Sequence, residues 1–146
     1  GERLATIRDE MHDAMEKGVG IYRKGRDMQA ACTKLAALRD RYRRGIKLDD
    51  RNRAFNTEWL TAIELGFTLE IAEVIAHSAL NRKESRGAHT WLEEFKERDD
   101  DDYLKHTLAY RTGDGPPRLD YAPVTITKSQ PKARVYGGEG KYVELT

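Results

Sequence analysis

The feature that most constrains the fold of this chain is a run of apolar residues between Trp59 and Leu80. In a helix, eleven of its apolar side chains would already cover most of the circumference: Trp59, Leu60, Ile63, Leu65, Phe67, Leu69, Ile71, Ala72, Val74, Ile75 and Leu80. Asn56 or Thr57 can cap the start of this helix. A helix that is apolar on several sides has to be covered on several sides. We therefore expect it to lie at the centre of its domain, packed by two other helices and by something outside the chain.

Basic residues and a glycine mark the expected end of this helix. We expect the helix to run to about Arg86, which would make it about 45 Å long at ~1.5 Å per residue. Arg82 and Lys83 would then lie in its last turns, where the negative end of the helix dipole favours cations. Gly87 can take the left-handed conformation that terminates a helix, so the sequence predicts the stop there.

Two further helices are predicted before the apolar run. The first spans about Glu2 to Lys17, because four apolar residues recur at steps of three and four and share one face: Leu4, Ile7, Met11 and Met15. The second is predicted to begin after Asp27, a good N-cap residue, and to continue to about Arg44. Gly45 supplies its stop.

The hydrophobic pattern changes after the acidic stretch that follows these helices. Residues 106–111 and 119–127 flank the turn-forming sequence TGDGPP, and Val124 and Ile126 alternate with Thr125 and Thr127, which predicts a hairpin. Pro123 and Pro131 favour edge strands or extended chain over a central sheet. The predicted fold class is therefore mainly α. We expect an antiparallel three-helix bundle over residues 1–105, followed over residues 106–146 by a small extended or β-hairpin segment with a flexible tail.

Composition excludes several classes of protein. Lys and Arg number 26 and Asp and Glu 25, so the formal charge of +1 gives no overall attraction for nucleic acid. Cys32 is the only cysteine, which rules out an intramolecular disulfide and favours a reducing compartment. No apolar run approaches the ~20 residues that span a bilayer. The chain opens without Met and already in helical rhythm, and we expect it to be a piece of a longer protein.

Charge is uneven along the chain. Residues 39–53 hold seven basic and three acidic side chains, and residues 93–102 hold seven acidic and two basic ones. The basic stretch lacks the aromatic platform of a nucleic-acid site, and the acidic run lacks the glycine and terminal glutamate of an EF-hand. Both are interpreted as solvated surface or as charged contacts with a protein partner.

Glu70, Glu73 and His77 share one face of the long helix and are the best candidates for metal ligands. Di-iron bundles, however, use Glu-x-x-His motifs on paired helices, and the first two helices offer no matching set. A polar stripe facing solvent or an interface is the preferred interpretation. His89 and Glu93 lack the second histidine of a zinc-protease helix. No residue is therefore assigned a catalytic, cofactor-binding or metal-binding role.

The chain resembles the C-terminal part of the flavoprotein subunit in the fumarate reductase and succinate dehydrogenase family. Seven segments carry the resemblance, in order along the chain: Ile7–Arg23, Phe55–Leu80, Arg82–His89, Glu97–Asp100, Tyr103–Arg111, Leu119–Thr127 and Arg134–Glu139. The element SRGAH is fairly specific, and the segments LKHTLAYR and RVYGG favour fumarate reductase. The chain departs from the usual pattern at Thr90 and Trp91, where the family generally places a basic residue.

The resemblance implies a role inside a larger enzyme. In the family, a separate Rossmann-like domain binds FAD, fumarate lies between that domain and a capping domain, and electrons arrive from quinol through an iron–sulfur subunit. The resemblance places the parent subunit in the cytoplasm, held at the inner face of the plasma membrane only through anchor subunits. This chain has no G-x-G-x-x-G after a strand and no flavin-attachment motif, so we expect it to bind no FAD and to be inactive alone.

The resemblance also suggests which residues meet those partners. We expect contacts with the FAD-binding and capping domains and with the iron–sulfur subunit from six residues: Arg82, Glu84, Arg86, His89, Arg98 and His106. The alternative is that these residues join the helical domain to its own tail, because buried charges must be paired. Three other functions stay open: the C-terminal domain of a succinate dehydrogenase flavoprotein, that of L-aspartate oxidase, and a stand-alone helical binding module.

Overall fold

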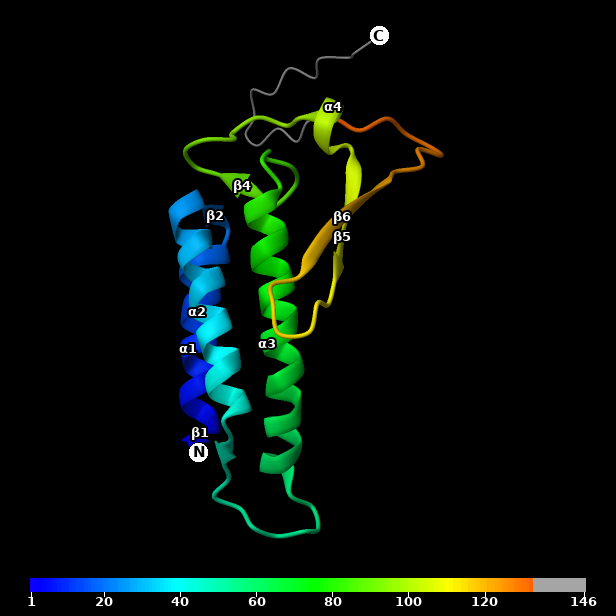
Figure 1. The fold of residues 1–146 in the computed structure, drawn as a ribbon. Helices are drawn as coiled ribbons and strands as arrows, with labels where there is room; N and C mark the ends of the chain where they lie inside the picture. Colours follow the sequence, from blue (N-terminus) through cyan, green and yellow to red (C-terminus); the bar gives the residue numbers. More distant parts are fainter. Residues whose placement is uncertain (133–146) are drawn as a thin grey trace, which may run out of the picture.

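Three long helices make up the main body of the fold. The computed structural model describes residues 1–132, and the helices are α1 (Leu4–Val19), α2 (Gly25–Arg43) and α3 (Thr57–Asn81). Figure 1 shows them side by side, and each packs against the other two. A short helix, α4 (Asp100–Tyr103), precedes the C-terminal hairpin. The prediction of a mainly helical chain with a small C-terminal sheet is confirmed.

The starts of the helices differ in how well they were predicted. Asn56 caps α3, and its side chain accepts a hydrogen bond of 2.8 Å from the backbone N–H of Trp59. The expectation that Asp27 caps α2 was wrong: α2 begins at Gly25, and Asp27 lies in its first turn. An acidic residue is also favourable in that position, because it faces the positive end of the helix dipole. Gly45, with φ of 120°, follows α2 as expected.

The expected end of α3 was also wrong. The helix stops at Asn81, and Arg82 already has extended backbone with ψ of 95°. Gly87 does have positive φ, but it lies in a separate tight turn in which Arg86 and His89 exchange backbone hydrogen bonds of 2.9 and 3.0 Å. The side chain of Arg82 donates to the backbone carbonyl of Tyr103 in α4, and this tertiary contact replaces the last turns that local propensity favours.

Within residues 1–132, six short strands form three two-stranded sheets. Two parallel pairs, of two residues per strand, were not predicted: β1 (Glu2–Arg3) with β3 (Ile46–Lys47), and β2 (Tyr22–Arg23) with β4 (Thr90–Trp91). The third pair is the predicted hairpin, in which β5 (Lys105–Tyr110) runs antiparallel to β6 (Arg118–Pro123). Residues 124–127, expected to extend its second strand, lie outside it. The segment Arg134–Glu139, used for the resemblance, lies outside the described residues.

The hydrophobic core lies between the three long helices. Its sixteen buried apolar residues are Leu4, Ile7, Met11, Val19, Met28, Ala31, Cys32, Leu35, Leu38, Ala62, Leu65, Leu69, Ala72, Ala76, Ala79 and Trp91. Only one side of α3 contributes to this core, although the helix is apolar on several sides. In residues 1–132, no helix combines the length and apolar character needed to cross a membrane.

Candidate functional site

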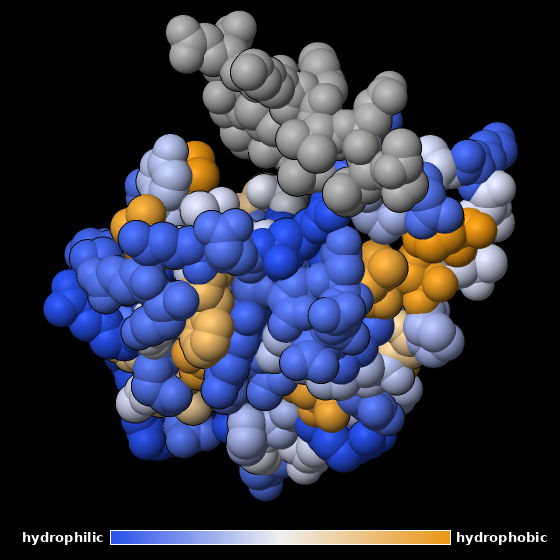
Figure 2. All heavy atoms as spheres, turned by 90° about the horizontal axis from the view of Figure 1, so that it is seen from above, coloured by the Kyte–Doolittle hydropathy of each residue, from blue (hydrophilic) through white to orange (hydrophobic). Residues whose placement is uncertain are grey.

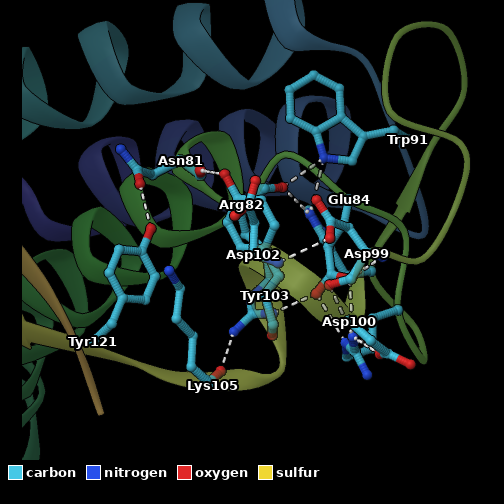
Figure 3. Close-up of polar contacts among 12 residues, drawn as sticks. Asn81, Arg82, Glu84, Trp91, Asp99, Asp100, Asp102, Tyr103, Lys105 and Tyr121 are labelled. Atoms are coloured by element: carbon cyan, nitrogen blue, oxygen red, sulfur yellow. Dashed lines mark hydrogen bonds and ion pairs between the residues drawn. The ribbon is translucent and has the colours of Figure 1, made fainter. Parts of the chain in front are cut away.

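The carboxylate of Glu84 lies at the centre of a cluster of charged residues just beyond α3 (Figure 3). Its side chain is completely buried. Arg86 donates to both carboxylate oxygens, at 2.8 and 3.1 Å, and the backbone N–H of Asp99 donates at 2.8 Å. Arg82 donates a further hydrogen bond to the same carboxylate. Burial alone would raise the pKa of Glu84, but these donors leave the pKa below its usual value, so the residue is ionised at neutral pH.

The two arginines of this cluster also bond to the segment that follows. The guanidinium of Arg82 donates to the backbone carbonyl of Tyr103 at 2.9 Å and to that of Lys105. Arg86 donates to the carboxylate of Asp100, which also accepts a hydrogen bond of 2.9 Å from Arg98. The cluster therefore fixes the end of α3 against α4 and the start of β5.

His89 forms a second part of the cluster. Its Nδ1 lies 2.7 Å from a guanidinium nitrogen of Arg23, and its Nε2 lies 2.9 Å from the backbone carbonyl of Arg82. An arginine can only donate, so Nδ1 must accept and Nε2 must carry the proton. Burial and the adjacent Arg23 lower the pKa of His89, which is consistent with this neutral tautomer.

Trp91 lies between the cluster and the hydrophobic core. Its side chain is buried, packs edge-on against Phe95 with 4.9 Å between ring centroids, and donates from Nε1 to the carbonyl of Arg82 at 2.9 Å. The departure from the family pattern at Thr90 and Trp91 therefore falls on β4, where Trp91 pairs with Arg23 of β2. In this chain the position holds an aromatic core residue.

A separate set of charges anchors the tip of the hairpin to α2 and α3. Arg39 is buried and donates to the Glu73 carboxylate at 2.6 Å and to the backbone carbonyl of Asp114 at 2.6 Å. Arg111 pairs with Glu70 at 2.9 Å. Two of the three metal-ligand candidates are thus bound to arginines. In the part of the chain that the structure describes, no three His, Cys, Asp or Glu side chains are grouped as metal ligands.

The six predicted contact residues do not all come together. Arg82, Glu84 and Arg86 share the buried cluster, and His89 joins them through the Arg82 carbonyl. Arg98 reaches the cluster through Asp100. His106 does not: it lies exposed on β5, opposite Ala122 of β6.

Sequence reasoning missed several members of the cluster and of the hairpin anchor: Arg23, Trp91, Asp99, Asp100, Asn81, Tyr121 and Arg39. Among these residues, only Trp91 carried a local signal of burial, because it is a large aromatic residue close to His89 in a mainly polar stretch. Arg23 and Arg39 carried none, because their partners lie 66 and 34 residues away along the chain.

These arrangements have the chemistry of structural contacts. The charged groups of the cluster satisfy one another, and the end of the molecule that carries the cluster presents a mainly hydrophilic surface (Figure 2). The thiol of Cys32 is buried, which raises its pKa to about 11 and keeps it protonated at neutral pH. The cluster thus positions segments of the chain and does not present an activated nucleophile.

The fold matches that of the helical C-terminal domain of a flavoprotein. A sequence model of the family described as fumarate reductase flavoprotein C-term matches residues 8–136. The chain therefore belongs to this family, and the resemblance drawn from its motifs is confirmed.

Three relatives locate the chain within the family. The fumarate reductase flavoprotein subunit of Haemophilus influenzae is 52% identical over 98% of this chain and 24% of its own length. The succinate dehydrogenase flavoprotein subunit of Coxiella burnetii is 38% identical over 86% of this chain and 20% of its own length. A solved structure of Escherichia coli quinol fumarate reductase is 54% identical, with a TM-score of 0.87, over 96% of this chain and 24% of that one. The chain spans about a quarter of the length of these relatives.

Proposed function

We propose that this chain supports the FAD-binding and capping domains of a fumarate reductase flavoprotein subunit and helps to seat the iron–sulfur subunit, without being catalytic itself. The observation that carries the proposal is the match of nearly the whole chain to one quarter of fumarate reductase flavoprotein subunits. The succinate dehydrogenase relative is less similar, which favours fumarate reductase as the parent activity. The parent complex would be held at the inner face of the plasma membrane by anchor subunits.

The proposed organisation follows the packing of the chain. We infer that residues 1–105 form an antiparallel three-helix bundle with its own core and that an appended segment begins at residue 106. All sixteen core residues precede residue 92, which supports this division among the described residues. The hydrogen bonds and ion pairs from the hairpin to α2 and α3 involve four residues: Arg39, Arg43, Arg111 and Tyr121.

The six contact residues take two roles in this proposal. His106 is exposed on β5, and Arg98 is a partly exposed residue paired with Asp100 at the edge of the cluster; these two contact the rest of the enzyme directly. The other four, whose polar groups are bonded within the chain, hold the loop that carries that surface: Arg82, Glu84, Arg86 and His89. This division reconciles contact with a partner and the internal pairing that a buried charge requires.

FAD belongs to the part of the parent subunit outside this chain. The donors and acceptors of the Glu84 cluster are bonded to one another, so they do not form a cradle for a dinucleotide. No step of the reaction is assigned to residues of this chain.

The proposal is tested by comparing the 146-residue chain with the complete product of its gene. The chain alone should show no flavin absorbance and should not reduce fumarate when a reduced dye supplies electrons. The complete product should be yellow and active. A yellow, active preparation of the 146-residue chain would overturn the proposal, as would a complete product without flavin. Nucleic-acid affinity that falls steeply with salt would instead support the stand-alone binding module.

A further inference from the structure

Exposed apolar side chains are concentrated on one side of α3. Twelve large apolar residues are exposed in residues 1–132, and seven of them lie on α3 or just before it: Phe55, Trp59, Leu60, Ile63, Phe67, Ile71 and Ile75. We call these seven residues the α3 outer face. Phe55 is fully exposed, and Trp59, Leu60, Phe67 and Ile71 are each more than half exposed. Contiguous apolar surface of this kind marks an interaction site more often than scattered exposed residues do.

The α3 outer face lies opposite the side of α3 that is buried in the core. At 3.6 residues per turn, Phe67 lies roughly 200° around the helix from Leu69, which is fully buried against α1 and α2. From Trp59 to Ile75 the exposed row advances in steps of four residues over about 24 Å, at ~1.5 Å per residue. Helix α3 is therefore apolar on two opposite sides, and the described chain covers only one of them.

The hairpin extends this face into a groove. A hollow of about 390 Å³ lies between α3 and the hairpin tip, with Phe67, Ile71 and Val74 on one wall and Ala109 and Pro117 on the other. Its charged lining groups are already paired: Arg39 with Glu73 and Arg111 with Glu70 within the lining, and Arg43 with Asp114 beside it. What the groove offers to a partner is thus mainly apolar contact.

We propose that the α3 outer face and this groove are the surface on which the FAD-binding part of the same subunit docks. This inference rests on the proposed function. About three quarters of the length of these relatives lies outside the region that this chain matches. In them, a large partner for this region therefore exists within the same polypeptide. The occupant is an apolar patch of that part, because charges at the groove are satisfied internally and an apolar helix side is stable only when covered.

The experiment compares the same residues in two contexts. Hydroxyl-radical footprinting with mass spectrometry measures the oxidation of Trp59 and Phe67 in the 146-residue chain and in the complete flavin-loaded subunit. We expect both residues to be several-fold less reactive in the complete subunit. Equal reactivity of these residues in the two contexts would overturn the proposed docking surface. A complete subunit that still contained flavin would in that case leave the proposed function intact. A complete product without flavin would instead refute the proposed function.

A pair of matched variants tests the surface directly. Phe67→Asp with Ile71→Asp places two charges on the α3 outer face. Ile21→Asp with Tyr22→Asp places two charges on similarly exposed apolar residues in the connection between α1 and α2, away from α3 in the sequence. In the complete subunit, the first pair should restore the oxidation of Trp59 to the level of the isolated chain, and the second pair should leave it unchanged. The same response from both pairs would overturn the proposal.

Other occupants give distinct results in the isolated chain. If a second copy covered the face, the chain would form a dimer that Ile71→Asp dissociates, as measured by analytical ultracentrifugation. If residues 133–146 covered it, Trp59 would already be protected in the monomer. Either result would overturn docking of the FAD-binding part.

Discussion

At Glu84, complete burial leaves the negative charge dependent on its hydrogen-bond donors. The donors come from Arg86, Arg82 and the backbone of Asp99. The two arginine side chains are 25% and 16% exposed, so neither can regain full hydration if the carboxylate is lost. Removing one partner of such a buried pair costs more than the pair contributes, because the remaining charge stays buried without compensation.

We therefore predict that Glu84→Gln lowers the free energy of unfolding by about 3 kcal/mol, the lower end of the range for breaking a buried ion pair, since the amide retains one acceptor. Urea unfolding followed by circular dichroism measures the loss. Glu64→Gln, on the exposed side of α3, is the matched control and should change stability by less than about 0.5 kcal/mol. If Glu84→Gln lowered the free energy of unfolding as little as Glu64→Gln does, the Glu84 cluster would contribute little to stability.

The lowered pKa of His89 leads us to predict that the stability of the chain depends on pH. Burial and the neighbouring Arg23 lower its pKa in the folded chain. As pH falls below about 6.5, the ordinary histidine value, the unfolded chain takes up the proton before the folded chain does. The stability present above that pH is then lost progressively as pH falls toward the folded pKa. Protonation would also place a hydrogen on Nδ1, where Arg23 donates.

Urea unfolding at pH 7.5, 6.5 and 5.5 measures this loss. His89→Gln should reduce the dependence, because an amide can accept from Arg23 and donate to the Arg82 carbonyl without titrating. Some dependence should remain, since burial also lowers the pKa of His77. If the variant and the unaltered chain had parallel profiles, the assignment of a neutral His89 would be contradicted.

The contact between α1 and α2 depends on a glycine in the last turn of α1. A Cβ added to Gly18 would lie 2.6 Å from the Cβ of Ala31 and 2.7 Å from the backbone carbonyl oxygen of Asp27. Neither atom belongs to a flexible side chain, so the two helices would have to separate. Glycine is therefore retained here in spite of its low helix propensity.

We predict that Gly18→Ala destabilises the chain. Overpacking of about 2 kcal/mol should exceed the gain of about 1 kcal/mol in helix propensity, which lowers the melting temperature by a few degrees. Thermal unfolding followed by circular dichroism measures the shift. Gly66→Ala is the comparison: its Cβ would meet the hydroxyl of Tyr42 at 2.7 Å, at the end of a side chain that can move. A larger loss for Gly66→Ala would contradict this account.

The elements that the sequence predicts well are those with strong local patterns. The apolar run predicted α3, Asn56 was one of two residues expected to cap it, and the TGDGPP turn predicted the hairpin. The two-residue parallel pairs could not be predicted, because each joins segments more than 40 residues apart and has no periodicity of its own. The end of α3 was misplaced for a related reason: the side chain of Arg82 bonds to Tyr103, and no local rule contains that contact.

The site shows the same division. Glu84 and its neighbouring arginines were found because the motif around SRGAH is specific, although their pairing with each other was only one of two interpretations. His106 was placed with them on the strength of the motif LKHT, and the structure puts it on an exposed strand position instead. The α3 outer face was foreseen in part, since the sequence already required cover on several sides of that helix.

For the whole molecule, the question is whether the helices depend on the hairpin. The core residues all precede residue 92, and the helices contact one another without the C-terminal segment. The hairpin is held to them by polar groups: Tyr121 donates to the Asn81 side chain at 2.6 Å, and Arg43 pairs with Asp114 at 2.5 Å. Loss of these contacts removes little apolar burial. It does leave Arg39 with Glu73 as its main partner.

We therefore predict that a chain ending at residue 105 keeps its helices and unfolds cooperatively, at a lower melting temperature than a control ending at residue 132. Helical circular dichroism per residue should rise, because the removed segment contains no helix among its described residues. The melting temperature should fall, because exposed polar contacts and the bonds from Arg39 to the hairpin tip are lost together. A shortened chain with native-like helical signal but no cooperative transition would show that the hairpin is part of one folding unit with the helices, and the proposed boundary at residue 105 would be wrong.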